Sequence, residues 1–349
     1  MALTADQIQK MSAEIGLSAV VNYLYGRETV LTKHPLISSL FPSEYVNRSV
    51  IGGLETSLGT SLWEKLALEF ASCNSIVMHH PSNFKKISNL PSEITTIVNN
   101  LDITAKPKSI IDEFLMVARR ESSKFSAFKP RTNKMDKGHG ADLYFELDND
   151  IYVVDIKTVQ WNAAGGDNFL HRLIKWGSYA IFFHPNKNVK VKIVIPYNPF
   201  QLSWWQHSKK KAEPLWETDI LVESEFWDLL TGLTDSYIYI EKGFNSIKNN
   251  PIIRLFESRF TDPVDQVFKR DILELYRNIK ITNWESSTKG NSAKVEATCN
   301  QCMKSFVTFD YVLLLQDSCP EHDSAYVSKK KFREIQEKRW YGLGNPAIK

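Results

Sequence analysis

The chain has 349 residues, of which 43% are hydrophobic and 24% charged, a composition typical of a globular protein and not of a disordered one. The formal net charge of +3 is compatible with nucleic-acid binding but does not single out that class. No stretch reaches the roughly 18 uninterrupted apolar residues of a membrane span, and no secretory signal pattern opens the chain. We therefore expect a cytoplasmic protein with no membrane partner and no small-molecule substrate.

The first part of the chain is predicted to be mainly helical. Apolar residues at helical spacing predict helices over residues 4–21, 52–74 and 110–120. A basic loop over residues 124–140 follows the third helix. Cys73, at the end of the second helix, is expected to be a buried free thiol.

The middle of the chain is predicted to be rich in β-strands. Two strands, 142–147 and 151–157, flank the turn residues Asp148 to Asp150, which gives a hairpin over residues 140–157. The segments predicted next are a helix over 171–176 and strands over 180–183 and 189–195.

The C-terminal part begins with an amphipathic helix predicted over residues 265–281. Residues 286–292 are small and polar and resemble a linker. A cluster of cysteines follows, with strand-like residues 305–315 inside it, and a polar helix is predicted over 328–340.

The hairpin contains a pattern that indicates chemistry. Asp155 and Lys157 are two apart in a strand, so their side chains leave the same face. If a tight turn pairs Leu147 with Asp150, Asp142 lies opposite Asp155, whereas a slip of one residue would turn Asp142 away. Two adjacent carboxylates need a cation, and such hard oxygen ligands suit Mg²⁺.

A lysine beside such a metal can orient a water molecule or stabilise charge that develops on a phosphodiester. The pattern therefore predicts Mg²⁺-dependent phosphodiester hydrolysis. The alternative is a solvated hairpin with ordinary surface charges. The apolar run Tyr152 to Val154 argues against it, because that run is expected to be buried up to the charged residue.

The spacing of Asp142 from Asp155-Ile-Lys157 resembles the PD-(D/E)XK signature of type II restriction endonucleases. Ala141 replaces the usual Pro, and Asp155 stands where Glu is more frequent. A narrower likeness, to the TdeIII-type group that cuts GG-(N)-CC-like palindromes, is carried by residues 27–33, 55–65 and 225–230. The resemblance covers roughly residues 15–250 and implies a homodimeric Mg²⁺ endonuclease acting on double-stranded DNA.

The resemblance also implies a fold and a further acidic residue. The expected fold is α/β, a restriction-endonuclease-like mixed sheet flanked by helices, with a small C-terminal zinc knuckle. In such nucleases a helix before the hairpin often adds an acid to the metal site, and Glu64 stands at that place. Glu55 competes for the role, and an exposed helical glutamate is the alternative for either.

The cysteines near the C-terminus have the spacing of a metal site. Cys299 and Cys302 form a CxxC pair, and after sixteen intervening residues Cys319 and His322 form a second pair. Four such ligands suit a closed, structural Zn²⁺ site, which would supply much of the folding energy of a small module. Reduced cysteines with an incidental histidine are the alternative, and a redox CxxC is disfavoured because no thioredoxin-like βαβ pattern precedes it.

The predicted organisation is a nuclease domain over residues 1–285, with its catalytic hairpin at 140–157, a zinc-binding module over 286–327, and a C-terminal basic helix over 328–349. Candidate DNA contacts are basic residues for phosphates and polar or planar residues for bases: Lys129, Arg131, Lys134, Lys137, Lys209 to Lys211, Lys329 to Lys331, Trp161, Asn162 and Arg172. Two other functions stay open: a repair or recombination nuclease without sequence specificity, and a non-catalytic zinc-containing DNA-binding protein.

Overall fold

The computed structural model describes most of the chain as two compact units. The first contains Met1–Ala5, Trp63–Ile238 and Arg339–Lys349, and the second contains Asp6–Leu62 and Tyr239–Lys338. These bounds differ from the boundary predicted near residues 286–292. The described residues are 2–26, 42–74, 76–99, 110–125, 128–157, 165–200, 202–204, 206, 217–259, 265–286, 292–315, 319 and 329–341.

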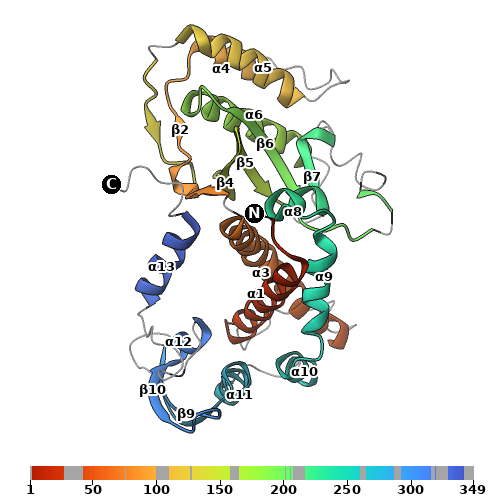
Figure 1. Ribbon diagram of the computed structural model, residues 1–349, viewed down its shortest axis with the longest axis vertical. Helices are drawn as coiled ribbons and strands as arrows, with labels where there is room; N and C mark the ends of the chain where they lie inside the picture. The colour runs from red at the N-terminus through yellow and green to blue at the C-terminus, as the bar shows by residue number, and fades with distance from the viewer. Residues whose placement is uncertain are drawn as a thin grey trace. The chain divides into compact units, whose positions relative to one another are not determined.

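A five-stranded mixed sheet forms the centre of the first unit (Figure 1). Its order is β1 (Val77–His79), β4 (Leu143–Leu147), β5 (Asp150–Ile156), β6 (Asn188–Ile195) and β7 (Ile220–Val222). The first three strands pair antiparallel, and β5, β6 and β7 pair parallel. The predicted class, a mixed α/β fold with helices flanking a sheet, is confirmed.

The hairpin of β4 and β5 has the tight turn on which the position of Asp142 depends. Leu147 pairs with Asp150, and the register continues to Leu143 opposite Val154. Asp148 adopts a φ of 54°, a conformation that aspartate tolerates in turns. Asp142 directly precedes the last pair of this ladder, Leu143 with Val154.

Helix α6 (Gly165–Phe183) connects the parallel strands β5 and β6, as such a connection requires. It lies with α5 (Ile110–Ser122) over one face of the sheet (Figure 1). The strand predicted over 180–183 is wrong. Ala180 and Ile181 are buried in the same cluster as Leu173 and Ile174, so they continue the apolar side of the helix.

Gly177 marks the closest approach of α6 to its neighbours. A Cβ at this position would lie 2.7 Å from Cδ2 of Leu115 on α5 and 3.3 Å from Cγ2 of Val191 on β6. Both distances are tighter than ordinary van der Waals contact. Glycine at this position therefore lets α6 pack directly on the sheet.

The other elements of the first unit surround this core. They are η1 (Pro81–Asn83), β2 (Lys86–Ile87), α4 (Ser92–Asn99), η2 (Ser123–Phe125), β3 (Thr132–Asn133), η3 (Glu217–Asp219) and α8 (Ser224–Thr231). The last turns of α3 (Pro42–Cys73) pack on α8, where Phe70 meets Trp227 edge to face. Cys73 is exposed, which corrects the expectation of a buried thiol, because the helix ends at this residue and turns its side chain outward.

The last described residues of the chain also belong to the first unit. Helix α13 (Lys329–Tyr341) ends with Arg339 and Trp340, which bind the buried carboxylate of Glu69. The two contacts are an ion pair of 2.7 Å and a hydrogen bond of 3.1 Å from the indole N–H. The polar helix predicted over 328–340 is confirmed within one residue at each end, and residues 342–349 of the predicted basic segment lie outside the described residues.

The second unit contains helices packed around an apolar cluster that includes Leu24, Val50 and Phe268. Gly243 allows a close crossing, because a Cβ there would lie 2.5 Å from the carbonyl oxygen of Gln9. Besides parts of α3 and α13, the helices that the structure describes in this unit are α1 (Ala5–Gly26), α9 (Tyr237–Ser246), α10 (Pro251–Ser258), α11 (Gln266–Arg277) and α12 (Asp310–Leu315). No helix that the structure describes is long and apolar enough to cross a membrane.

A three-stranded antiparallel sheet completes the second unit, in the order β10 (Ser305–Phe309), β9 (Ala293–Cys299) and β8 (Ile279–Ser286). The helix predicted over 265–281 ends early, because Asn278 adopts a left-handed cap at φ 51° and Ile279 begins β8. The strand-like segment 305–315 likewise divides at Asp310, where α12 begins.

Candidate functional site

The hairpin brings the two predicted aspartates together. The backbone N–H of Asp142 donates to the carbonyl of Val154 at 2.9 Å, so Asp142 and Leu143 both lie opposite Val154, as in a β-bulge. Asp155 is the last residue but one of β5, and Lys157 follows directly after the strand. The tight turn is the one that the sequence permitted, and the carboxyls of Asp142 and Asp155 lie within electrostatic reach of each other although Asp142 bonds to Val154.

Asp155 is buried, with 2% of its side chain exposed. The Nζ of Lys157 donates to its Oδ1 at 2.7 Å. Its Oδ2 lies 3.5 Å from Nη1 of Arg172 on α6 but accepts no hydrogen bond from any N–H or hydroxyl that the structure describes. A buried carboxylate oxygen without a donor is costly, so this atom is suited to a cation.

Asp142 is held in place by the opposite strand. Its Oδ2 accepts a hydrogen bond of 2.7 Å from the backbone N–H of Ile156. Burial, together with the nearby charge of Asp155, raises the pKa of the Asp142 carboxyl to about 6. Each of the two carboxyls disfavours the ionisation of the other, so a bound cation would stabilise their ionised forms.

Glu64, on the part of α3 that belongs to the first unit, is the third acid of this cluster. Burial and the charge of Asp142 raise the pKa of Glu64 to about 7, so the two carboxyls lie within electrostatic reach of each other. Glu55, two turns earlier in α3, is exposed and belongs to the second unit. Glu64, and not Glu55, is thus the glutamate whose pKa responds to Asp142, although the three carboxyls, unlike the three cysteine thiols, do not all lie within 4.8 Å of one another.

These residues fit a magnesium ion. Asp142, Asp155 and Glu64 offer only hard carboxylate oxygens, and one buried oxygen lacks a donor. Mg²⁺ takes one or two carboxylates and keeps several waters, which leaves positions for a substrate. Sequence reasoning could not find the ion pair with Arg172, because no spacing rule relates a helix residue to a strand seventeen positions earlier.

The cysteine cluster lies at the end of the sheet in the second unit. The thiol sulfurs of Cys299, Cys302 and Cys319 all lie within 4.8 Å of one another, close enough for one metal ion. Cys302 Sγ and Cys319 Sγ are 3.4 Å apart. His322, the fourth predicted ligand, lies outside the described residues.

A tight turn shapes this cluster. The N–H of Met303 donates to the carbonyl of Cys299, and the N–H of Cys299 donates to the carbonyl of Lys304. Met303 has a φ of 60°, which closes the turn between β9 and β10. The backbone N–H of Cys302 lowers the pKa of the Cys299 thiol, which favours the thiolate that binds metal.

A family model described as "Type II restriction endonuclease, HinfI" matches residues 8–248, more than half of the chain. The chain belongs to the HinfI family. The matched region includes all of Glu64, Asp142, Asp155 and Lys157, whereas the cysteine cluster lies beyond it.

A relative of this HinfI-family chain is the Type II restriction enzyme MjaII of Methanocaldococcus jannaschii. The two are 24% identical over 239 residues, which is 64% of this chain and 61% of MjaII, so the chain spans less than two thirds of that relative. No solved structure matches the chain. The resemblance to type II restriction endonucleases is confirmed for the family, while the TdeIII-type grouping and its GG/CC target remain predictions.

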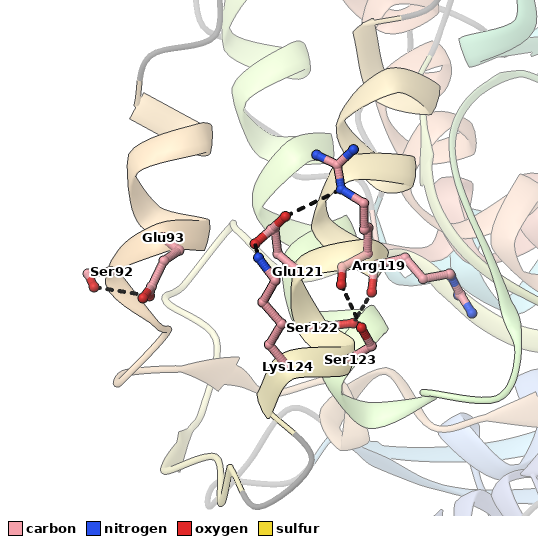
Figure 2. Close-up of polar contacts among 8 residues, drawn as sticks. Ser92, Glu93, Arg119, Glu121, Ser122, Ser123 and Lys124 are labelled. Atoms are coloured by element: carbon pink, nitrogen blue, oxygen red, sulfur yellow. Dashed lines mark hydrogen bonds and ion pairs between the residues drawn. The ribbon is translucent and has the colours of Figure 1, made fainter.

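The predicted DNA contacts of the HinfI-family chain are partly described. Lys129, Arg131, Lys134 and Lys137 are all exposed in the segment before the hairpin. Lys124 instead forms an ion pair of 2.5 Å with Glu121 at the end of α5 (Figure 2). Trp161, Asn162 and Lys209 to Lys211 lie outside the described residues, as do the side chains of Lys329 to Lys331.

Proposed function

We propose that this chain is a Mg²⁺-dependent type II restriction endonuclease that cleaves both strands of double-stranded DNA at a specific site. The observation that supports the proposal is the pair of carboxyls Asp142 and Asp155, which lie within electrostatic reach of each other, with Lys157 donating a hydrogen bond of 2.7 Å to Asp155. Membership of the HinfI family supports it. The relative MjaII is itself described as a type II restriction enzyme.

In the proposed site Asp142 and Asp155 would hold the magnesium ion, and Glu64 would add a third carboxylate. The bound ion would lower the pKa of its water and offset charge that grows on the phosphodiester. Lys157 donates a 2.7 Å hydrogen bond to Asp155, so its ammonium lies beside a carboxylate that would hold the ion. Its role is to orient the water and to stabilise negative charge in the transition state.

The reaction is a hydrolysis that needs no further co-reactant. The oxygen of the attacking water forms a bond to phosphorus while its proton passes to solvent. The bond between phosphorus and the leaving sugar oxygen breaks, and that oxygen takes up a proton. Each DNA strand is cut once in this way.

The target and the assembly follow from the same proposal. We infer a palindromic site that contains GG and CC, on the likeness of residues 55–65 and 225–230 to the TdeIII-type group. A palindrome requires two active sites related by a two-fold axis, so the proposed enzyme is a homodimer. Cys299, Cys302, Cys319 and His322 would bind a structural Zn²⁺, because four ligands leave no open position for chemistry.

Digestion of a plasmid of known sequence with Mg²⁺, followed by sequencing of the ends, tests the function. Discrete fragments with ends at one GG/CC-containing palindrome are expected, and a chelator should abolish them. A smear of fragments would favour the repair or recombination nuclease instead. Binding of the plasmid without cleavage would favour a non-catalytic DNA-binding protein.

A further inference from the structure

Arg172 is the one cation near the carboxylates that the proposed mechanism does not use, among the side chains that the structure describes. It lies on α6, with 23% of its side chain exposed, and its Nη1 is 3.5 Å from Oδ2 of Asp155. Lys157 binds the other oxygen, Oδ1, at 2.7 Å. The two cations therefore divide the two oxygens of one buried carboxylate between them.

The two contacts differ in kind. The contact with Lys157 is a hydrogen bond, whereas Oδ2 accepts no hydrogen bond and meets Arg172 only as an ion pair. A purely structural partner of a buried carboxylate is expected to donate a hydrogen bond to it, since an arginine fork matches a carboxylate so well. The loose contact leaves Oδ2 available to a metal ion without the loss of a strong bond.

Counting formal charges shows what Arg172 would do in the loaded site. Asp142, Asp155 and Glu64 carry −3 when ionised, and Lys157 with Arg172 carries +2, which leaves −1. A divalent ion changes this to +1, and one phosphodiester then brings the site to neutrality. Without the arginine the loaded site would be neutral before the phosphate arrives and would not attract it.

We propose that Arg172 occupies Oδ2 of Asp155 in the metal-free site and binds the scissile phosphodiester once a divalent cation takes that oxygen. This inference rests on the proposed function. The guanidinium suits both tasks, because it is always charged and its fork pairs with carboxylate and phosphate alike. In the metal-free protein Arg172, the residue that would bind the phosphate, therefore contacts Asp155, and it is released when a metal ion binds Asp155.

The test compares Arg172→Gln and Arg172→Lys with Lys175→Gln, which removes an exposed charge one turn later on the same helix. Calorimetric titration of DNA-free protein with Mg²⁺ is expected to show affinity raised severalfold in Arg172→Gln, because the competing cation is gone. Affinity for a plasmid-derived duplex in Ca²⁺ should fall about tenfold, and single-turnover cleavage by about 100-fold. Arg172→Lys should recover part of both losses, and Lys175→Gln should change none.

Arg172→Gln with unchanged or weaker Mg²⁺ affinity would overturn the inference and leave a structural ion pair. Should that variant not fold, Arg172→Lys decides by the same titration, since a lysine is a weaker partner of Oδ2. Wild-type protein that binds Mg²⁺ but cuts no DNA would overturn the proposed function instead. The Mg²⁺ titration of the variants therefore tests the role of Arg172, and cleavage by the wild-type protein separately tests the proposed function.

Discussion

The carboxylate cluster of the first unit and the thiol cluster of the second unit both gather groups that repel one another once ionised. The carboxylates come from three elements, α3, the start of β4 and β5, and cations accompany them. Two of the three described thiols come from one short turn, and backbone N–H groups accompany them. The first arrangement suits an exchangeable ion with chemistry beside it, and the second suits an ion that stays.

The difference teaches how far each site depends on the rest of the fold. The thiol cluster needs one turn and one returning segment, so a metal ion can organise it locally. The carboxylate cluster needs the sheet register and the packing of two helices before any ion binds. Loss of the ion at the carboxylates should therefore lower activity, and loss of the ion at the thiols should lower the stability of the fold.

The largest effect is expected for Asp155→Asn, which keeps the shape of the side chain and removes the ligand charge. Cleavage in Mg²⁺ should fall by about 1,000-fold, measured as single-turnover cutting of a labelled duplex. The melting temperature should stay within a few degrees of wild type. Asp148→Asn, in the exposed turn of the same hairpin, is the matched control, and a comparable loss there would contradict a specific role of Asp155.

The next effect concerns the second unit. Cys302→Ser should abolish stoichiometric zinc, measured by elemental analysis, and lower the free energy of unfolding by more than about 4 kcal/mol. Cys73→Ser alters an exposed thiol and should change neither quantity. Zinc-free wild-type protein of undiminished stability would remove the contrast between the two clusters.

The smallest effect is a change in pH dependence. The pKa of Glu64 is raised to about 7 and that of Asp142 to about 6, so both must lose protons before they bind a metal. Cleavage should therefore rise as the pH increases from 5 to 8, and Glu64→Gln should lose the rise near pH 7 and about tenfold in rate. Glu55→Gln, on the exposed part of the same helix, should keep the wild-type profile.

The same raised pKa has a consequence for stability in the absence of metal. A carboxyl whose pKa is higher in the folded than in the unfolded state contributes stability below its unfolded pKa of about 4.5, and this contribution is lost as the pH rises through about 7. The metal-free melting temperature should fall over that range and fall less in Glu64→Gln. An identical slope in the two proteins would count against burial of Glu64 beside Asp142.

The sequence predicted the hairpin well because its signal is local. The apolar run up to Asp155, the turn residues and the two-residue period fix which side chains share a face. The same local reasoning failed at residues 180–183, where four apolar residues suited a strand as well as a helix. Only packing against the sheet shows that Ala180 and Ile181 continue α6.

Other features needed the fold itself. Glu55 and Glu64 stand on one predicted helix with equal local propensity, and only the packing of α3 distinguishes them. Arg172 reaches Asp155 across the gap between a helix and a strand, which no spacing in the sequence encodes. The end of the helix at Asn278, by contrast, carried a signal that could have been used, since asparagine often caps helices in the left-handed conformation.

Gly177 sets a limit on how this protein can be redesigned. One added methyl group would press on Leu115, which can rotate away, and on Val191, which belongs to a central strand and can yield only a few tenths of an ångström. Helix α6 also carries Arg172, so a side chain at position 177 that moved the helix away from the sheet would lengthen the distance between Arg172 and Asp155. A library that varies α6 therefore has to keep glycine at position 177.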